Sequence, residues 1–573
     1  MTATPWGFRD ILPEEAQARE EIAQTVKGCF REHHYLPVET PILEDKFGLE
    51  EGGRIADSPF KLFDDDGRLL VVRPDNTLPI VRLVSNRMKA SDLPLRLRYE
   101  APVVRELSRG AGGSRQFTQL GFELIGQGGA EGDVEAVALA AEAVRELGMG
   151  DAKIVCGSVR PFKELLASCE DRALATDALA LVHANNFVDL DIRVSKSDAP
   201  EPLAAAICEL PRVCGGMEAL DRVDALLAQA GVDAQATSEL RALADGLSAE
   251  DAARLSFDFS IMNSFDYYTG LVFKVYAGGL PDPVGSGGRY DSIFSGVFGE
   301  GMEVPAAGFA FSLERLESVR TEAELAAEAA CGDHAAARDA AAPLRIAVPK
   351  GSLKADTMEV LEEAGIDVSE LRDPGRHLIV KGVDTRGGAD SIGEIEFVIV
   401  RPSDAPAFVS CGGADCGICG RDSLIEADLK LLQLVDLGYG ACKFIEAEPA
   451  WRAGEAERNY ARRGSLRVAT KYPRIASEWY ASRGVNAEIV SLHGNIELGP
   501  IVGMTDRIVD ITATGATLRE NDLVITGEIM KCAARFFVNP GAARLDPRVR
   551  MLADRLAAAV EHLHFEPVAG ASQ

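Results

Sequence analysis

The sequence lacks the features of a membrane, secreted or nucleic-acid-binding protein. No apolar run in its 573 residues approaches the roughly 18 residues that a membrane span needs. The N-terminus, MTATPWGFRD, has no basic segment followed by an apolar core, so we expect no secretory signal. The net charge of -29 disfavours a general affinity for nucleic acid, which needs clustered Lys and Arg. It leaves room for anionic small substrates, because a site needs only a few local cations.

The cysteine pattern excludes a disulfide framework. The eleven cysteines have no short regular spacing, which in a chain of this size indicates reduced thiols. We therefore expect a cytoplasmic location. Hydrophobic residues make up 47% and charged residues 26% of the chain, as expected for a packed globular protein. At roughly 100–200 residues per domain, the length predicts about three to five domains.

One shift in composition divides the chain. Residues 321–343, TEAELAAEAACGDHAAARDAAAP, are rich in Ala, and we interpret them as a linker rather than one more surface helix. Before it, strand-like runs surround an Ala/Leu-rich stretch at about 160–252, which predicts an α+β domain of residues 1–320 with a helical insertion. After it, short β-branched runs alternate with helical stretches, as is typical of α/β domains.

The most informative stretch after the linker is DRIVDITATGATL, residues 506–518. A buried strand ends in a polar turn and runs on towards LRENDL, which could open a helix. A helix N-terminus favours a phosphate, Gly515 allows close approach, and the hydroxyls of Thr514 and Thr517 add donors. Asp510 suits sugar hydroxyls. The segment points to a sugar phosphate, and a plain strand–turn–helix with Thr caps remains the alternative.

Several blocks of the same half occur together in one order. They are LRIAVPKGSL (344–353), VRPSDAPAFV (400–409), GGADCGICGRDSL (412–424), LRVATKYP (466–473), GNIELGPIVGMTDRIVDITATGATL (494–518) and VNP (538–540). Together they resemble short-form ATP phosphoribosyltransferase over residues 344–567. The resemblance implies transfer of phosphoribosyl from phosphoribosyl pyrophosphate (PRPP) to N1 of ATP with release of pyrophosphate, the first step of histidine biosynthesis. It also implies two α/β lobes, like those of periplasmic binding proteins, with the site between them.

The resemblance implies roles for individual residues. It places the 5-phosphate on Thr514, Gly515, Ala516 and Thr517, the ribose on Asp510, pyrophosphate or ATP phosphates on Lys350, Arg376 and Arg401, and ATP near Glu497 and Asp415. Mg²⁺ is implied as a partner brought in by the phosphates, without protein ligands. Ser352 stands where the family usually has Arg, and Ala513 where many relatives have Glu, so this sequence departs from the family at two expected contacts.

Three cysteines of this half have a spacing that suggests another cofactor. Cys411, Cys416 and Cys419 match a plant-type [2Fe–2S] run, for which Cys442 could be a fourth ligand. The surrounding ADCGICGRD indicates instead a buried strand leading to a tight turn, in which Cys acts as a small hydrophobe. We expect no cluster.

The first half carries a second set of ordered blocks. They are residues 5–44, VVRPDNTLPIVR (71–82), LRYEAPVVRE (97–106), SRQFTQLGFELIG (114–126), FDYYTGLVF (265–273), GSGGRYD (285–291) and GFAFSLERL (308–316). This half resembles histidyl-tRNA synthetase, which implies a class II synthetase-like antiparallel sheet domain.

The polar residues of these blocks suit a free histidine. Asp75, Thr77, Gln119 and Glu123 match its ammonium and ring nitrogens, and Arg105 suits its carboxylate through a planar fork. Tyr267 and Tyr268 can wall an imidazole. Each alone is more often a structural residue, and together they predict a histidine pocket. We interpret the adjacent His33 and His34 as surface residues.

Two departures argue against a working synthetase. Asn263 stands where the synthetase has an arginine, and a neutral amide cannot supply that charge. After Leu316 the linker follows, so no anticodon-reading domain is expected. This is the pattern of the regulatory subunit of short-form ATP phosphoribosyltransferase. We predict a histidine-inhibited fused transferase that needs no tRNA or membrane, and the resemblance implies a homo-oligomer, a tetramer. An active histidyl-tRNA synthetase with an appended domain, or a non-catalytic ligand-binding sensor, remain the alternatives.

Overall fold

The computed structural model describes residues 4–46, 59–106, 114–232, 237–261, 268–294, 303–320, 342–388, 391–563 and 565. Tyr267, Asn263 and residues 321–341 of the expected linker lie outside these ranges. The chain forms two compact units. The N-terminal unit comprises Met1–Ala340 and Pro540–Leu545, and the C-terminal unit comprises Ala341–Asn539 and Asp546–Gln573.

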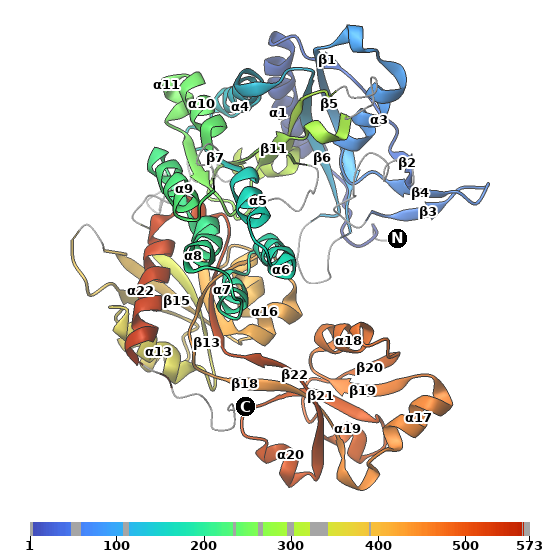
Figure 1. Cartoon of the computed structure of the whole chain (residues 1–573), viewed down its shortest axis with the longest axis vertical. Coiled ribbons are helices and arrows are strands. Elements are labelled where there is room, and N and C mark those ends of the chain that lie inside the picture. The colour runs from blue at the N-terminus through green and yellow to red at the C-terminus, as the bar shows by residue number, and fades with distance from the viewer. Residues whose placement is uncertain are drawn as a thin grey trace. The chain divides into compact units, whose positions relative to one another are not determined.

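The N-terminal unit is built on a large, mostly antiparallel sheet (Figure 1). Its order is β1 (Leu36–Pro37), β5 (Leu95–Val104), β6 (Gln116–Ile125), β12 (Ala306–Ser312), β11 (Gly285–Arg289), β10 (Leu271–Tyr276), β7 (Lys153–Ser158), β9 (Leu255–Asp258) and β8 (Cys214–Gly215). The pairs β1–β5 and β7–β9 are parallel. A small sheet of β2 (Leu43–Asp45), β4 (Leu69–Val72) and β3 (Lys61–Phe63) accompanies it. The apolar runs of the sequence therefore form the expected strands.

Helices surround this sheet. They are α1 (Pro13–Glu32), α3 (Thr77–Arg87), α4 (Gly129–Glu146), α5 (Arg160–Ala167), α6 (Arg172–His183), α7 (Phe187–Ser195), α8 (Glu201–Glu209), α9 (Met217–Gln229), α10 (Ser238–Gly246), α11 (Ala249–Ala252) and α21 (Ala542–Leu545), with short 3-10 turns η1 (Ala90–Asp92), η2 (Leu210–Arg212) and η4 (Asp291–Phe294). The segment from α5 to α11 coincides with the Ala/Leu-rich stretch. Its spaced apolar residues Leu203, Ile207, Leu220, Val223 and Leu227 are buried, as their helical periodicity requires.

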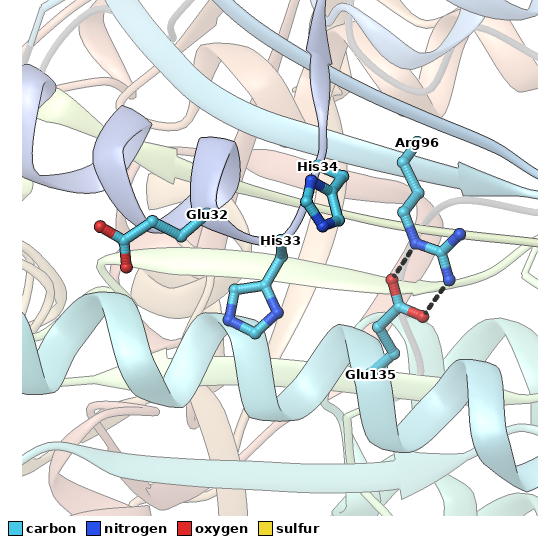
Figure 2. A pocket seen from close by; sticks show the side chains of 5 residues that line it. All are labelled: Glu32, His33, His34, Arg96 and Glu135. Atoms are coloured by element: carbon cyan, nitrogen blue, oxygen red, sulfur yellow. Dashed lines mark hydrogen bonds and ion pairs between the residues drawn. The ribbon is translucent and has the colours of Figure 1, made fainter.

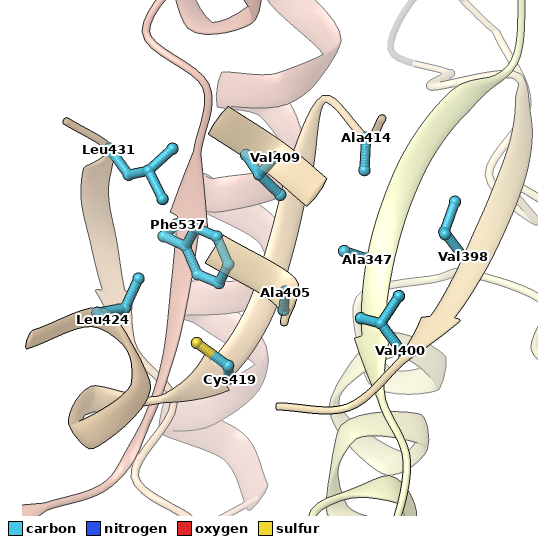
Figure 3. Close-up of a cluster of buried hydrophobic side chains, with 10 residues drawn as sticks. All are labelled: Ala347, Val398, Val400, Ala405, Val409, Ala414, Cys419, Leu424, Leu431 and Phe537. Atoms are coloured by element: carbon cyan, nitrogen blue, oxygen red, sulfur yellow. The ribbon is translucent and has the colours of Figure 1, made fainter. Parts of the chain in front are cut away.

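The C-terminal unit contains two mixed sheets. The first has the order β14 (Ile379–Val383), β15 (Glu394–Val400), β13 (Leu344–Pro349), β16 (Cys416–Gly420), β23 (Ala534–Val538) and β17 (Leu432–Asp436). Its helices are α13 (Lys354–Glu363), α14 (Ser369–Arg372), α15 (Ala405–Ser410), α16 (Arg421–Ala427) and α22 (Pro547–Leu563). Figure 3 shows its buried cluster, in which Val409, Cys419 and Phe537 come from a helix and two strands.

The second sheet has the order β20 (Ala487–Ser491), β19 (Leu466–Thr470), β21 (Arg507–Thr512), β18 (Cys442–Pro449) and β22 (Leu523–Cys532). Its helical segments are η5 (Ala450–Arg452), α17 (Glu455–Arg463), α18 (Pro473–Ser482), α19 (Leu498–Ile501) and α20 (Ala516–Glu520). The chain passes from the first sheet to the second between β17 and β18, and returns between β22 and β23. The two sheets are thus joined by two chain crossings.

The cysteine spacing does not describe an iron–sulfur site. Cys416 and Cys419 lie fully buried in β16, three residues apart, so their side chains point to opposite faces of the strand. Cys411 is exposed. Within the ranges that the structure describes, no group of three or more His, Cys, Asp or Glu could hold a metal ion. In those same ranges no helix is both long and apolar enough to cross a membrane.

Candidate functional sites

Charged residues lie near the ends of three parallel strands, at one edge of the second sheet. β20 and β21 both pair in parallel with the central β19, so the carboxyl ends of all three meet at the same edge. Lys471 follows β19, Glu497 lies in the segment after β20, and Asp510 lies near the end of β21. Ligands of open α/β sheets bind at the carboxyl edge of the strands, which makes this edge a candidate site.

The Asp510 carboxyl is the most perturbed acid of this edge. Its partial burial raises the pKa to about 6, although the Ile511 N–H, which donates to Oδ1 at 2.8 Å, opposes the rise. The nearby Glu497 raises the pKa further, while Lys471 lowers it. Asp510 and Glu497, singled out in the sequence, therefore lie close enough to interact.

The turn after β21 has a left-handed residue at its centre. Gly515 adopts φ 69° and ψ 12°, a conformation that favours glycine. Its N–H donates to Thr512 Oγ1 at 2.9 Å, and the Ala516 N–H reaches Thr514 Oγ1 at 3.4 Å. Thr514, Ala516 and Thr517 are exposed. The expected helix follows, but α20 has only five residues, and β22 begins soon after it, at Leu523.

The cations of the first sheet lie together at one of its edges. Lys350 follows β13 and Arg401 follows β15, which are parallel partners, and the Lys350 N–H donates to Val400 O at 2.9 Å. Arg376 precedes β14, which runs antiparallel to β15 and so begins at the same edge. All three side chains are exposed. The structure therefore places the three cations singled out in the sequence at one edge of this sheet.

Asp415 lies elsewhere. It precedes β16, so it sits at the opposite edge of the sheet from Lys350 and Arg401. Its carboxylate accepts from the Arg345 N–H at 2.8 Å and lies 3.6 Å from the Arg345 guanidinium. This placement does not support the expected ATP-side role of Asp415, because its carboxylate contacts Arg345 of the same sheet.

One hydrogen bond joins the two sheets beside Asp510. The Tyr472 hydroxyl, just after β19, donates to Asp422 Oδ2 at 3.1 Å, and Asp422 follows β16 of the first sheet. The Asp422 charge contributes to raising the pKa of Asp510. Sequence reasoning overlooked Asp422, Lys471, Tyr472 and Thr512. Lys471, Tyr472 and Thr512 lie at the end of β-branched runs or just after them, which was a signal that could have identified them, whereas Asp422 follows CGICG and has no such signal.

The N-terminal unit holds a small polar cavity of about 70 Å³. Asp75, Thr77, Arg105, Gln119 and Tyr268, all singled out in the sequence, line it with Tyr99, Ser286, Gly287, Tyr290, Gly308, Phe309 and Ala310. The lining comes from α3, the central strands and the segments between them. The structure thus brings together five of the predicted histidine contacts, and sequence reasoning missed Tyr99, Ser286 and Tyr290.

Glu123 lies against this cavity, on β6. It accepts hydrogen bonds from Thr77 Oγ1 at 3.0 Å and from the Tyr99 hydroxyl at 3.3 Å, and also from the Tyr290 hydroxyl. Burial raises the pKa of this carboxyl to about 8. A Cβ on Gly308, the partner of Glu123 across the sheet, would lie 1.7 Å from Glu123 Oε2. Only glycine therefore fits at position 308 while this carboxyl holds its place.

The remaining cavity residues are positioned by contacts with both backbone and side chains. Arg105 Nε donates to Pro74 O at 2.8 Å, and the guanidinium lies 4.9 Å from the Phe117 ring centroid. Gln119 Oε1 accepts from Asn76 Nδ2 at 2.8 Å. Asp75 Oδ1 accepts from the Leu78 N–H at 3.3 Å. The cavity thus combines carboxyl groups, a cation and aromatic hydroxyls, which are groups that can bind a free amino acid.

A second hollow lies at the surface of the same unit (Figure 2). Glu32, His33, His34, Arg96 and Glu135 line it. Both histidines are exposed, as the sequence predicted, and His33 Nε2 lies 2.8 Å from Glu142. The Arg96 guanidinium makes two hydrogen bonds of 2.7 Å to Glu135. The side chains of His33 and Arg96 are thus paired with carboxylates.

Both units are similar to known proteins. The family model for histidyl-tRNA synthetase matches residues 7–316, and that for ATP phosphoribosyltransferase matches residues 401–558. The ATP phosphoribosyltransferase of Rubrobacter xylanophilus is 46% identical over 202 residues, 35% of this chain and 89% of that protein. The chain belongs to the ATP phosphoribosyltransferase family and carries a domain of the histidyl-tRNA synthetase family.

The N-terminal part of this transferase is similar to regulatory subunits. The ATP phosphoribosyltransferase regulatory subunit of Moorella thermoacetica is 37% identical over 348 residues, 60% of this chain and 87% of that protein. A solved structure from Bacillus halodurans, described as an ATP phosphoribosyltransferase regulatory subunit/histidyl-tRNA synthetase, is 26% identical, with a TM-score of 0.50 over 63% of this chain and 90% of that one. The chain is therefore an ATP phosphoribosyltransferase of histidine biosynthesis with a regulatory-subunit-like domain. The predicted identity, activity and mixed α/β class are confirmed.

Proposed function

We propose that the carboxyl edge of the second sheet binds PRPP and that Asp510 orients its ribose. The observation that carries this proposal is the convergence of Lys471, Asp510 and the Thr514–Thr517 turn at that edge. The ionised carboxylate accepts hydrogen bonds from ribose hydroxyls, and the turn offers amides and threonine hydroxyls to the 5-phosphate. Thr512 supports the turn by accepting from the Gly515 N–H.

The reaction needs orientation and charge stabilisation more than a strong base. The lone pair of adenine N1 attacks C1 of the ribose while the bond from C1 to pyrophosphate breaks. Positive charge develops on the sugar and negative charge on the leaving group, so a fixed carboxylate and nearby cations favour the transition state. In this proposal Lys350, Arg376 and Arg401 attract the pyrophosphate or ATP phosphates, and Glu497 faces ATP.

Magnesium enters this proposal as part of the substrates. Mg²⁺ binds through phosphate oxygens and one or two carboxylates and keeps several waters. Held by those phosphates, without ligands from the protein, the ion would supply positive charge to the leaving pyrophosphate. The protein's own residues hold the sugar and the 5-phosphate.

The N-terminal cavity is the proposed sensor for histidine. Asp75, Thr77, Gln119 and Glu123 surround the ammonium and ring nitrogens, Arg105 holds the carboxylate, and Tyr268 walls the imidazole, with Tyr267 as a further predicted wall residue. The proposed domains follow from these roles. Residues 1–320 form the regulatory domain, with a helical insertion at about 160–252, and residues 321–343 form the linker. Residues 344–567 form the two catalytic lobes, like those of periplasmic binding proteins. A homotetramer without tRNA is the assembly that the resemblance implies.

An activity assay tests this assignment. Purified protein is incubated with ATP, PRPP and Mg²⁺, and phosphoribosyl-ATP is measured with and without histidine. Product formation that histidine slows is the expected result. Thr517→Val should raise KM for PRPP because it removes a hydroxyl donor, whereas Thr176→Val, which changes an exposed hydroxyl of α6, should not. Product formation with an unchanged KM in Thr517→Val would place the phosphate elsewhere.

A further inference from the structure

Two cysteines lie opposite each other where the chain enters and leaves the second sheet. Cys442 is the first residue of β18 and Cys532 the last residue of β22. In the antiparallel pairing of these strands, which Figure 1 shows side by side, the two residues are direct partners. Directly opposed residues of antiparallel strands have Cα atoms about 4.5–5.5 Å apart, within the range that a disulfide spans.

The two thiols already interact. A hydrogen bond between them lowers the pKa of Cys442 and raises the pKa of Cys532. Cys532 is 3% exposed, whereas Cys442 is half-buried. A small oxidant can therefore reach Cys442, and Cys532 is held in place beside it.

We propose that Cys442 and Cys532 are an oxidisable thiol pair whose disulfide lowers transferase activity. The oxidant is a hydroperoxide. The Cys442 thiolate attacks one peroxide oxygen, the O–O bond breaks, and the departing hydroxide takes up a proton to become water. Cys442 is then a sulfenic acid. The Cys532 sulfur attacks that of Cys442, the S–O bond breaks, and the second water leaves with the Cys532 proton, so that two thiols and one hydrogen peroxide give one disulfide and two waters.

The position of the pair explains the expected loss of activity. Lys443, next to Cys442, is the cross-strand partner of Thr512, whose hydroxyl fixes Gly515 of the proposed phosphate turn. An S–S bond of about 2.05 Å is shorter than the contact between two hydrogen-bonded thiols, so its formation shifts the two cysteine side chains beside Lys443. It also ties together the two crossings between the sheets, which restricts any domain closure around substrates. This effect on activity rests on the proposed PRPP site, whereas formation of the disulfide does not.

The other cysteines of the C-terminal unit provide matched controls. Cys411 is exposed, and Cys416 and Cys419 are fully buried in β16. Oxidation of Cys411 is the main competing cause of a peroxide effect. Cys411→Ser removes that exposed thiol and leaves the proposed pair intact, while Cys442→Ser and Cys532→Val each remove one partner.

The test uses the full-length protein treated with hydrogen peroxide, blocked with N-ethylmaleimide and digested without reduction. Mass spectrometry should find the Cys442 and Cys532 peptides joined, activity should fall about tenfold, the change that 1.4 kcal/mol of barrier produces, and dithiothreitol should reverse both. Cys411→Ser should behave like the parent, and Cys442→Ser and Cys532→Val should resist. Absence of the joined peptide, or its formation without loss of activity, would overturn the proposal. Because the joined peptide is read without any assay of catalysis, a wrong PRPP site would leave the peptide intact and remove only the activity effect.

Discussion

At the scale of single residues, burial and spatial neighbours decide which of the candidate groups are unusual. Asp510 was visible in the sequence as the acid near the end of a buried strand, but one of its charged neighbours, Asp422, comes from a distant segment of the chain. Likewise Gly308 was part of a quoted block, yet only the structure explains it, through the Glu123 carboxyl that occupies the space of its missing Cβ. Local patterns indicate residue types, whereas three-dimensional neighbours set their chemistry.

The first prediction concerns the pH dependence of PRPP binding. With a pKa raised to about 6, Asp510 is ionised above that pH and neutral below it. A neutral carboxyl is a poorer acceptor for ribose hydroxyls, so KM for PRPP should rise as pH falls through about 6, with kcat changing less. The measurement is a pH series of KM and kcat for the parent and for Asp510→Asn. If KM for PRPP rises at low pH in Asp510→Asn just as in the parent, the rise comes from protonation of a PRPP phosphate and not of this residue.

The second prediction concerns the cavity of the N-terminal unit. Gly308→Ala adds a Cβ that would overlap Glu123 Oε2, so the carboxyl must leave its hydrogen bonds with Thr77 and Tyr290. We expect histidine binding, measured by isothermal titration calorimetry, to weaken by about tenfold or more, since a lost hydrogen bond to a charged group is worth about 1.5–3 kcal/mol. Gly150→Ala adds the same methyl where no atom lies within 4 Å and should bind histidine normally. Unchanged binding in Gly308→Ala would exclude Glu123 from the site.

At the scale of elements, the strands were largely predictable and the connections were not. The β-branched runs gave β13, β15, β19 and β21 because buried parallel strands are apolar along their whole length. The polar turn after β21 predicted a helix, but α20 stops after five residues. A segment of six residues, Pro540–Leu545, belongs to the N-terminal unit although the sequence assigned it to the transferase. The periodicity of the sequence does not reveal this assignment, because it depends on contacts with residues that are distant in the chain.

The third prediction tests this segment. Arg544 is buried, and it donates to Asp258 Oδ2 at 3.0 Å, to Ser260 Oγ at 2.9 Å and to the Tyr276 hydroxyl at 3.3 Å. Arg544→Leu would leave the Asp258 carboxylate without its main counter-charge and should lower the free energy of unfolding by about 3–5 kcal/mol. Urea unfolding followed by fluorescence measures this.

Arg315→Leu is the matched control for that variant. It removes an exposed ion pair with Asp282 in the same unit, which should cost about 0–1 kcal/mol. Equal losses in the two variants would mean that the burial of Arg544 does not matter for stability.

At the scale of the whole molecule, fusion makes the regulator and the enzyme one thermodynamic system. If histidine changes the affinity for PRPP by some factor, PRPP must change the affinity for histidine by the same factor. Such a factor arises only when histidine binds one conformational state better than another. Coupling between sites is typically about 5–150-fold, so we expect histidine to weaken PRPP binding within that range.

The final prediction is that this factor is equal in both directions and depends on Arg105. Calorimetry gives the histidine affinity with and without saturating PRPP, and the PRPP affinity with and without saturating histidine. Arg105→Ala should reduce the affinity for histidine because it removes the planar fork that we propose holds the ligand carboxylate, while PRPP binding without histidine and basal activity stay as in the parent. Arg254→Ala, which alters a guanidinium of the same unit away from the cavity, should keep the full coupling. A coupling factor of one in the parent would mean that histidine binding does not change the affinity of the transferase site for PRPP.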